Sequence, residues 1–184
     1  MGDDLEVSAD WPHIEQFRAS GGEARRQAFC ALYDRHAGSV RDYLLRLTGC
    51  PHLAEDLTQE VFLRAYSGLD GFSGRSSFKT WVYQIAINLF RDHLRARKPM
   101  AEMKAADLTD PQPGAEWRAQ RDEEAHKVRS AVAALPQELR ETLILVRFEG
   151  MKYREAAEAL GITIDAVRMR VHRAHLALVT ALTT

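Results

Sequence analysis

The segment Tyr153–Arg173 constrains the fold of this chain most, because its residues specify two short helices joined by a tight turn. Gly161 falls where the first helix must stop in a left-handed conformation, which glycine adopts readily. Thr163 can cap the second helix, and Asp165 suits the positive end of that helix's dipole. Small or apolar residues of the first helix leave room for a close crossing: Ala156, Ala157 and Leu160. These features predict a helix-turn-helix.

The second helix of this motif should have a buried and an exposed side. At about 100° per residue, its buried stripe consists of Val167, Val171 and Ala174. Residues that point outward or lie on the flanks are Arg168, Met169, Arg170, His172 and Arg173. A helix that presents arginine and no acid over its last turns suits the DNA major groove. An ordinary helical hairpin with a solvated basic face is the alternative, but spacing, glycine and charge together favour DNA binding.

Length and composition narrow the class of protein. A chain of 184 residues is long enough for one or two small domains with adequate cores. No apolar run approaches the roughly 18 residues that span a bilayer, and the acidic amino terminus does not resemble a signal peptide. We therefore expect a cytoplasmic protein without direct membrane insertion. Cys30 and Cys50 fit neither a disulfide framework nor a zinc module.

Charge is segregated along the chain, although the net charge is only −1. Within residues 75–98 every charged residue is Lys or Arg except Asp92, and no acidic residue follows Val167. The stretch between these basic blocks is acidic and rich in proline, as a linker would be. Strand-type alternation is absent. The sequence predicts an all-α fold: a helical domain over 20–98, an acidic flexible linker over 99–122 and a second helical domain over 123–182.

The helix expected roughly from Leu53 to Leu69 carries an unusual exposed face. Its buried side should comprise Ala54, Leu57, Val61, Phe62 and Ala65. Its opposite side presents Asp56, Gln59 and Glu60 with Leu63 among them. A leucine inside an acidic face departs from binary patterning, but single exposed leucines are common. A protein-contact surface and an ordinary exposed leucine are both compatible with this pattern.

A polar loop, residues 72–77, leads into a helix expected over Phe78–Arg97. Its core side should hold Phe78, Trp81, Val82, Ile85 and Leu89. Another side carries Gln84, Asn88, Arg91 and Arg95, close to Tyr83 and to the serines of the loop. Amide groups beside cations suit unstacked bases held against a phosphate-neutralising groove. The local chemistry is equally compatible with an amphipathic helix whose arginines are solvated.

Segments in the order of the chain resemble bacterial sigma factors. Residues 55–66, EDLTQEVFLRAY, look like region 2.2, and residues 72–88, FSGRSSFKTWVYQIAIN, resemble regions 2.3 and 2.4. Residues 135–140, LPQELR, look like the start of region 4.1, and Tyr153–His172 is similar to the helix-turn-helix of region 4.2. Order, spacing and the absence of further regions match the extracytoplasmic-function (ECF) subfamily. The resemblance covers about residues 25–180.

This resemblance implies binding to core RNA polymerase and promoter DNA, regulation by an anti-sigma factor, and neither catalysis nor a cofactor. It assigns the core-polymerase contact to Asp56, Gln59, Glu60 and Leu63. It assigns capture of the minus-10 strand to Ser73, Arg75, Ser76, Lys79, Tyr83, Gln84, Asn88, Arg91 and Arg95. It assigns the minus-35 duplex to Arg168, Met169, Arg170, His172 and Arg173.

Other classes of protein share parts of this sequence pattern. A sigma-like protein or helix-turn-helix regulator that does not itself support initiation would share the carboxy-terminal motif. A metalloprotein would need more than the i, i+3 pair His172 and His175, for which the sequence offers no third ligand, so we expect no metal. For regulation, an anti-sigma partner is favoured over a redox switch at Cys30 or Cys50, because free cysteines in helical domains usually pack in the core.

Overall fold

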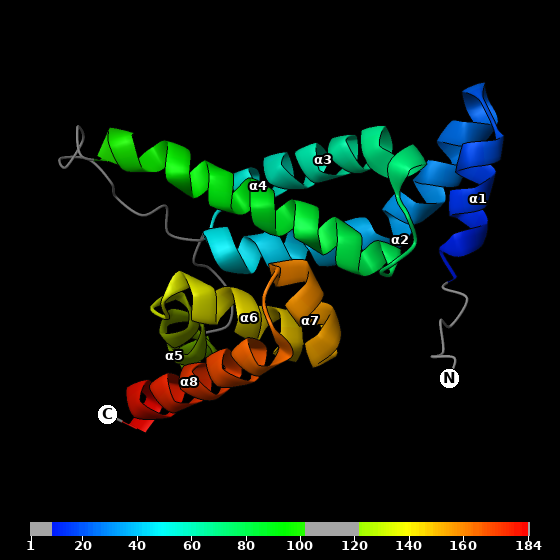
Figure 1. Cartoon of the computed structure of the whole chain (residues 1–184). Coiled ribbons are helices and arrows are strands. Elements are labelled where there is room, and N and C mark those ends of the chain that lie inside the picture. Colours follow the sequence, from blue (N-terminus) through cyan, green and yellow to red (C-terminus); the bar gives the residue numbers. More distant parts are fainter. Residues whose placement is uncertain (1–8, 102–121, 184) are drawn as a thin grey trace.

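The computed structural model describes residues 9–101 and 122–183, and every regular element within them is helical (Figure 1). The N-terminal helical unit consists of α1 (Trp11–Ala19), α2 (Gly22–Thr48), α3 (Pro51–Gly68), the short 3-10 helix η1 (Leu69–Gly71) and α4 (Phe78–Ala101). The C-terminal helical unit consists of α5 (Asp122–Ala133), α6 (Gln137–Arg147), α7 (Tyr153–Leu160) and α8 (Ile164–Thr183). The predicted all-α class is confirmed.

Local sequence explains where α2 ends and α3 begins. Gly49 adopts a left-handed conformation with φ 67°, and its amide donates to the Leu45 carbonyl oxygen at 2.9 Å. Pro51 then begins α3. At this first helical position a backbone N–H has no partner within the helix, so proline's lack of one costs little. The predicted inner side of α3 is buried as expected, with α3 beginning two residues before the expected Leu53.

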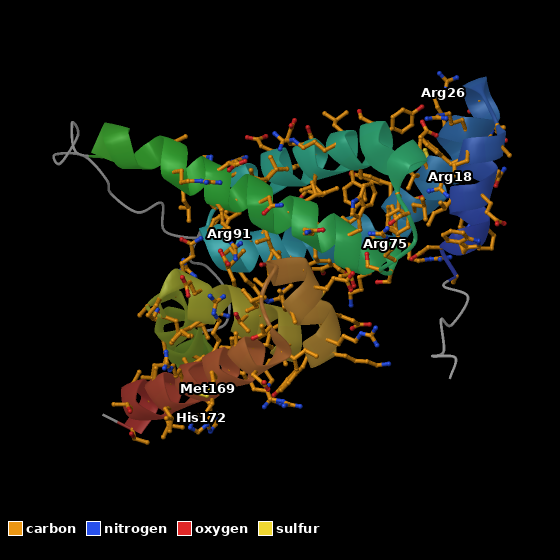
Figure 2. The ribbon with its side chains drawn as sticks, in the orientation of Figure 1. Arg18, Arg26, Arg75, Arg91, Met169 and His172 are labelled. Carbon is orange, nitrogen blue, oxygen red and sulfur yellow. The ribbon has the colours of Figure 1, made fainter. Side chains whose placement is uncertain are left out.

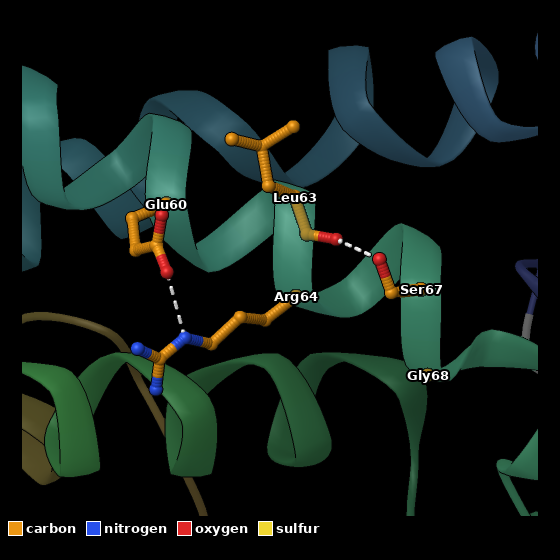
Figure 3. Close-up of a pocket in the computed structure, with 5 residues that line it drawn as sticks. All are labelled: Glu60, Leu63, Arg64, Ser67 and Gly68. Carbon is orange, nitrogen blue, oxygen red and sulfur yellow. Dashed lines mark hydrogen bonds and ion pairs between the residues drawn. The ribbon is translucent and has the colours of Figure 1, made fainter.

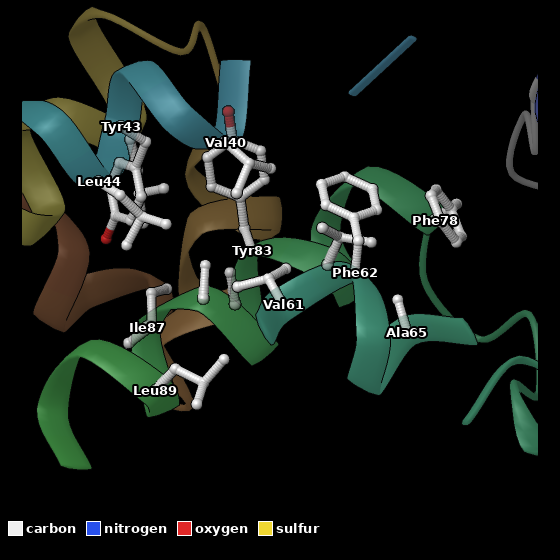
Figure 4. Packing of buried hydrophobic residues seen from close by; sticks show 14 of the residues in the cluster. Val40, Tyr43, Leu44, Val61, Phe62, Ala65, Phe78, Tyr83, Ile87 and Leu89 are labelled. Carbon is white, nitrogen blue, oxygen red and sulfur yellow. The ribbon is translucent and has the colours of Figure 1, made fainter. Parts of the chain in front are cut away.

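The core of the N-terminal unit forms where α2, α3 and α4 meet (Figure 4). Aromatic rings link these helices edge to face: the centroids of Tyr43 and Tyr83 lie 5.3 Å apart, and those of Phe29 and Phe62 lie 6.3 Å apart. Such pairs add to the free energy of area burial. Burial raises the pKa of the Tyr43 hydroxyl well above its ordinary value.

The sequence predicts a first domain that begins at residue 20, but helix α1 precedes that boundary. It buries only Ile14 and Phe17, and nine residues are too few to display a helical period. Its anchor is Asp10, which is nearly fully buried and accepts from Arg35 at 2.7 Å and contacts His36 at 3.0 Å. These partners lie 25 and 26 positions away, so no local pattern reveals them.

The predicted linker over 99–122 also begins differently. Helix α4 continues past Pro99 to Ala101. Asp122 already belongs to α5. The rest of the predicted linker lies outside the described residues.

The helix-turn-helix has the predicted geometry. Gly161 is left-handed, with φ 68° and ψ 36°, and the amide of Ile162 donates to the Ala157 carbonyl oxygen at 3.0 Å. Thr163 caps α8 by accepting from the Ala166 amide at 3.2 Å. The predicted stripe Val167, Val171 and Ala174 is buried.

The two helical units pack against each other along one side (Figure 1). Helix α4 contacts α7, and α2 contacts α6. Ile144, Leu145 and Met151 of the C-terminal unit belong to the same buried cluster as the core of the N-terminal unit. Residues expected to bind DNA on α4 therefore lie at an interface within the molecule.

Candidate nucleic-acid and polymerase interfaces

The acidic face of α3 is exposed, as the sequence predicted. Asp56 and Gln59 are exposed, and Leu63 is 64% exposed, the largest value among the exposed large apolar side chains of the described residues. Glu60 accepts from Arg64 at 2.8 Å on the same helix. A shallow depression beside this face is lined by Glu60, Leu63, Arg64, Ser67 and Gly68 (Figure 3). An apolar side chain in such a setting is available to a protein partner.

The 72–77 loop presents Ser73 and Arg75 to solvent and leaves Ser76 half-buried. Its last residue, Ser77, caps α4 by accepting from the Thr80 amide at 3.0 Å. Gly74 has φ +70°, a conformation that favours glycine. Figure 2 places Arg75 at the end of α4 that lies close to α1. The loop residues predicted to bind DNA are thus gathered at one end of the N-terminal unit.

Farther along α4, Gln84, Asn88 and Arg95 are exposed. Asn88, Arg91 and Arg95 share a groove with residues of α6 and of the helix-turn-helix. The C-terminal residues in this groove are Gln137, Glu138, Glu141, Leu160, Gly161, Ile162 and Arg170. The groove therefore joins the side of α4 expected to hold the minus-10 strand to the C-terminal unit.

Glu141 of α6 accepts hydrogen bonds from Arg91 across this groove. Its carboxylate is 1% exposed and accepts from Arg91 Nη2 at 2.8 Å, from Arg91 Nε at 3.2 Å and from Gln137 Nε2 at 2.7 Å. The guanidinium expected to neutralise a phosphate is neutralised here by a carboxylate of the same chain.

Glu149, between α6 and α7, forms the second such contact. Its carboxylate accepts from the Tyr83 hydroxyl at 2.7 Å and from Arg46 at 3.3 Å, and its carbonyl oxygen accepts from Lys79 Nζ at 2.8 Å. Burial and the hydrogen bond to Glu149 raise the pKa of Tyr83 far above its ordinary value, so its hydroxyl stays protonated and donates.

The resemblance assigns Tyr83 to the minus-10 strand. This residue is fully buried, packed against Tyr43 and bonded to Glu149, and in this arrangement its ring is closed to DNA. Lys79 is half-buried because Glu149 holds its ammonium group. Neither Glu141 nor Glu149 was singled out from the sequence, since their partners lie 50 and 66 positions away.

The outward side of α8 matches its prediction more closely. Met169 is 51% exposed, His172 and Arg173 are exposed, and Figure 2 shows Met169 and His172 on the side of α8 away from the N-terminal unit. Arg168 pairs with Asp165 at 3.0 Å on an exposed surface. Arg170 instead turns toward α6, where Glu138 accepts from it at 2.7 Å.

The remaining predictions concern a metal site, the two cysteines and a membrane-spanning helix. Among the described side chains, no group of three His, Cys, Asp or Glu residues could hold a metal ion, so His172 and His175 have no third ligand there. Cys30 is exposed and Cys50 is half-buried, which corrects the expectation that both pack in the core. Within residues 9–101 and 122–183, no helix has the length and apolar character needed to cross a bilayer.

Comparisons with known proteins match both helical units. Residues 32–99 match the model of sigma-70 region 2, and residues 125–178 match that of sigma-70 region 4. RNA polymerase sigma-H factor of Pseudomonas aeruginosa is 33% identical over 169 residues, which cover 85% of this chain and 87% of that protein. ECF RNA polymerase sigma factor SigW of Bacillus subtilis is 29% identical over 168 residues, covering 83% and 88%.

Solved structures show the same likeness. The sigma factor RpoE in complex with the anti-sigma factor NepR, from Bartonella quintana, superposes with a TM-score of 0.72 and 25% identity, covering 85% of this chain and 97% of that one. CnrH in complex with the cytosolic domain of CnrY gives a TM-score of 0.70 and 27% identity, covering 96% and 98%.

Proposed function

The chain belongs to the ECF family of RNA polymerase sigma factors, and from this membership we propose how its exposed side chains divide the work of initiation. It binds core RNA polymerase and directs promoter-specific transcription initiation. The observation that carries this function is the match of regions 2 and 4, in that order, to the two helical units. We propose no catalytic chemistry of its own, and a place in the cytoplasm with the polymerase.

Run-off transcription with purified core polymerase tests this function. Promoter-dependent transcripts should appear only when the chain is added. A helix-turn-helix regulator that does not support initiation would bind promoter DNA and yield no transcript from core polymerase alone. That outcome would contradict the sigma-factor function and favour a helix-turn-helix regulator.

The acidic face of α3, with Leu63 at its centre, is the proposed contact with core polymerase. Asp56→Arg should weaken core association at least about tenfold, because a partner surface that complements this acidic face would then meet a like charge, which costs several kcal/mol. Affinity can be measured by fluorescence anisotropy of the labelled chain titrated with core enzyme. Asp56 is exposed, so the circular dichroism spectrum of the variant should remain that of a helical protein.

Glu158→Arg supplies the matched control for this variant. It makes the same charge reversal at an exposed position of α7, outside the proposed contact, and should leave core affinity unchanged. Equal weakening by both variants would assign the effect to net charge, and an unfolded Asp56→Arg would make the face structural.

The exposed side of α8 is the proposed reader of the minus-35 duplex. Arg173→Ala should relax sequence preference, since an arginine bidentate to guanine contributes roughly 1–3 kcal/mol of discrimination. Arg168→Ala should weaken binding evenly on all sequences and lower its salt dependence, as a phosphate contact does. Holoenzyme binding to a set of minus-35 variants at several salt concentrations separates the two. Even loss on all sequences for Arg173→Ala would exchange these roles.

The 72–77 loop and the exposed side of α4 are the proposed site for the minus-10 strand. Ser73, Arg75, Ser76, Gln84, Asn88 and Arg95 have side chains that are exposed or half-buried in this arrangement. Lys79, Tyr83 and Arg91 are held by the C-terminal unit. Their participation requires the two helical units to separate, which binding to the much larger core polymerase can bring about.

An anti-sigma factor is the proposed regulator. This proposal is supported by the neighbours solved with NepR and with the cytosolic domain of CnrY. Co-purification of the tagged chain from its native cell should yield a stoichiometric inhibitor of run-off transcription. Since Cys30 is exposed, Cys30→Ser and Cys50→Ser should also be tested under oxidant. Activity that follows the thiols without any inhibitor would favour the redox switch.

A further inference from the structure

Helix α1 lies outside the region 2 match, which begins at residue 32, yet it is fastened to the loop that precedes α4. Arg18 of α1 donates to the carbonyl oxygen of Leu69, at 3.3 Å from Nη2 and 3.4 Å from Nε, and also to that of Phe72. One guanidinium group therefore holds the backbone at the entrance of the 72–77 loop. Figure 2 shows Arg18 and Arg75 at the same end of the molecule.

Trp11 supports the middle of the same loop. A Cβ atom added to Gly74 would lie 2.9 Å from Cζ3 of the Trp11 ring, closer than real Cβ atoms approach other atoms, and a tight 3.1 Å from Cη2. The indole thus rests directly on the backbone of Gly74. Arg18 lies over the same ring, with its Cζ atom 5.8 Å from the centroid. Trp11 and Arg18 form one contact surface under the loop.

The anchoring of α1 makes this surface rigid. Phe17 is fully buried, and its ring packs edge-on against Tyr66 of α3 with centroids 5.2 Å apart. At the other end, buried Asp10 is held by Arg35 and His36, and the His36 ring lies 5.3 Å from that of Phe78, the first residue of α4. Support therefore reaches the loop at its entrance, its middle and its exit.

We propose that α1 is a brace for the 72–77 loop, and that Trp11 and Arg18 are positioning residues for capture of the minus-10 strand. This inference rests on the proposed function of the loop. Neither residue needs to touch DNA. They hold the backbone that carries Ser73, Arg75 and Ser76, so that the loop loses little conformational freedom when a strand binds.

A double-mutant cycle at Trp11 and Gly74 tests the brace. Asparagine tolerates positive φ, so Gly74→Asn isolates the steric conflict with the indole. In the wild-type background it should displace the ring and weaken capture, whereas in the Trp11→Ala background it should cause little further loss. Additive losses in the double variant would show that the two residues do not act through each other, and would overturn the proposal.

Two measurements read the cycle. Hydrogen exchange of the free chain should show faster exchange across residues 72–77 in Trp11→Ala, with the cores of α2 and α3 unchanged. Holoenzyme should bind a promoter fragment premelted over its minus-10 region about tenfold more weakly, equivalent to about 1.4 kcal/mol, at unchanged core affinity. Trp11→Phe should retain most of the wild-type affinity for the premelted fragment. Gln16 is exposed on the same helix, so Gln16→Ala should bind the fragment like the wild type.

Failure of the brace differs from failure of the proposed function. A wild-type chain that yields no run-off transcript contradicts the function, while the exchange measurement still decides whether α1 fixes the loop. Wild-type exchange over the loop in Trp11→Ala would overturn the brace. So would a loss of core affinity and thermal stability in proportion to the loss of strand binding, because that pattern indicates a general stabilising role.

Discussion

Replacing Arg91 by alanine should separate the two helical units. Glu141 is 1% exposed and owes its charged hydrogen bonds to Arg91, with Gln137 as the remaining donor. Breaking a buried pair by removing one partner costs roughly 3–5 kcal/mol, because the other charge stays buried and uncompensated. Exposing α6 to water relieves that cost. Small-angle X-ray scattering should then report a larger radius of gyration than for the wild type.

Arg95→Ala provides the matched control for this prediction. Arg95 lies on the same helix, but it is exposed and pairs with Asp92 of its own helix. Such surface pairs contribute little, so the compact shape should persist. An unchanged radius of gyration for Arg91→Ala would mean that water hydrates Glu141 in place, and that the shared apolar core alone holds the units together.

Asn88→Ala should abolish most strand opening while leaving core binding intact. Extruding a base from a duplex costs a few kcal/mol, and the Asn88 amide, exposed on α4, is the proposed source of hydrogen bonds that offset this cost. Leaving the polar groups of the extruded base without hydrogen bonds costs about 1–3 kcal/mol, or roughly 5- to 150-fold in the population of open complex. Permanganate reactivity of unpaired thymines measures that population.

Asn88→Asp sharpens this test, because it keeps the shape of the side chain and replaces the amide's donor with a negative charge. It should be at least as defective as Asn88→Ala. Both variants should associate with core polymerase like the wild type. Normal permanganate reactivity in Asn88→Ala, or a loss of core association, would remove Asn88 from the proposed strand site.

Sequence reasoning succeeded where one local period decides the structure. The stripe Val167, Val171 and Ala174 on α8 is buried as predicted, and so is the inner side of α3. Gly161 ends α7 in the expected left-handed conformation. Periodicity and caps are local properties, and the sequence displays them directly.

The contacts that the sequence did not reveal are long-range. Tyr83 looked available for DNA beside its loop, but Glu149, 66 positions away, takes its hydroxyl. Arg91 was expected to neutralise a phosphate of the minus-10 strand, but in this arrangement Glu141 holds it. Helix α1 is too short to show a period, and its support of Gly74 depends on the tertiary position of Trp11. Pairings of this kind depend on how complete helices pack, which no short window of sequence contains.

The packing of the two helical units makes the proposed strand site depend on how the units are arranged. The proposed duplex-reading side of α8 faces outward in the compact molecule, with Met169 half exposed, whereas Arg91 and Tyr83 are occupied inside it. A duplex can be inspected without rearrangement, but a single strand can be held fully only after the units part. Under these proposed roles the chain alone lacks a complete strand site, and the binding of core polymerase that parts the units completes it.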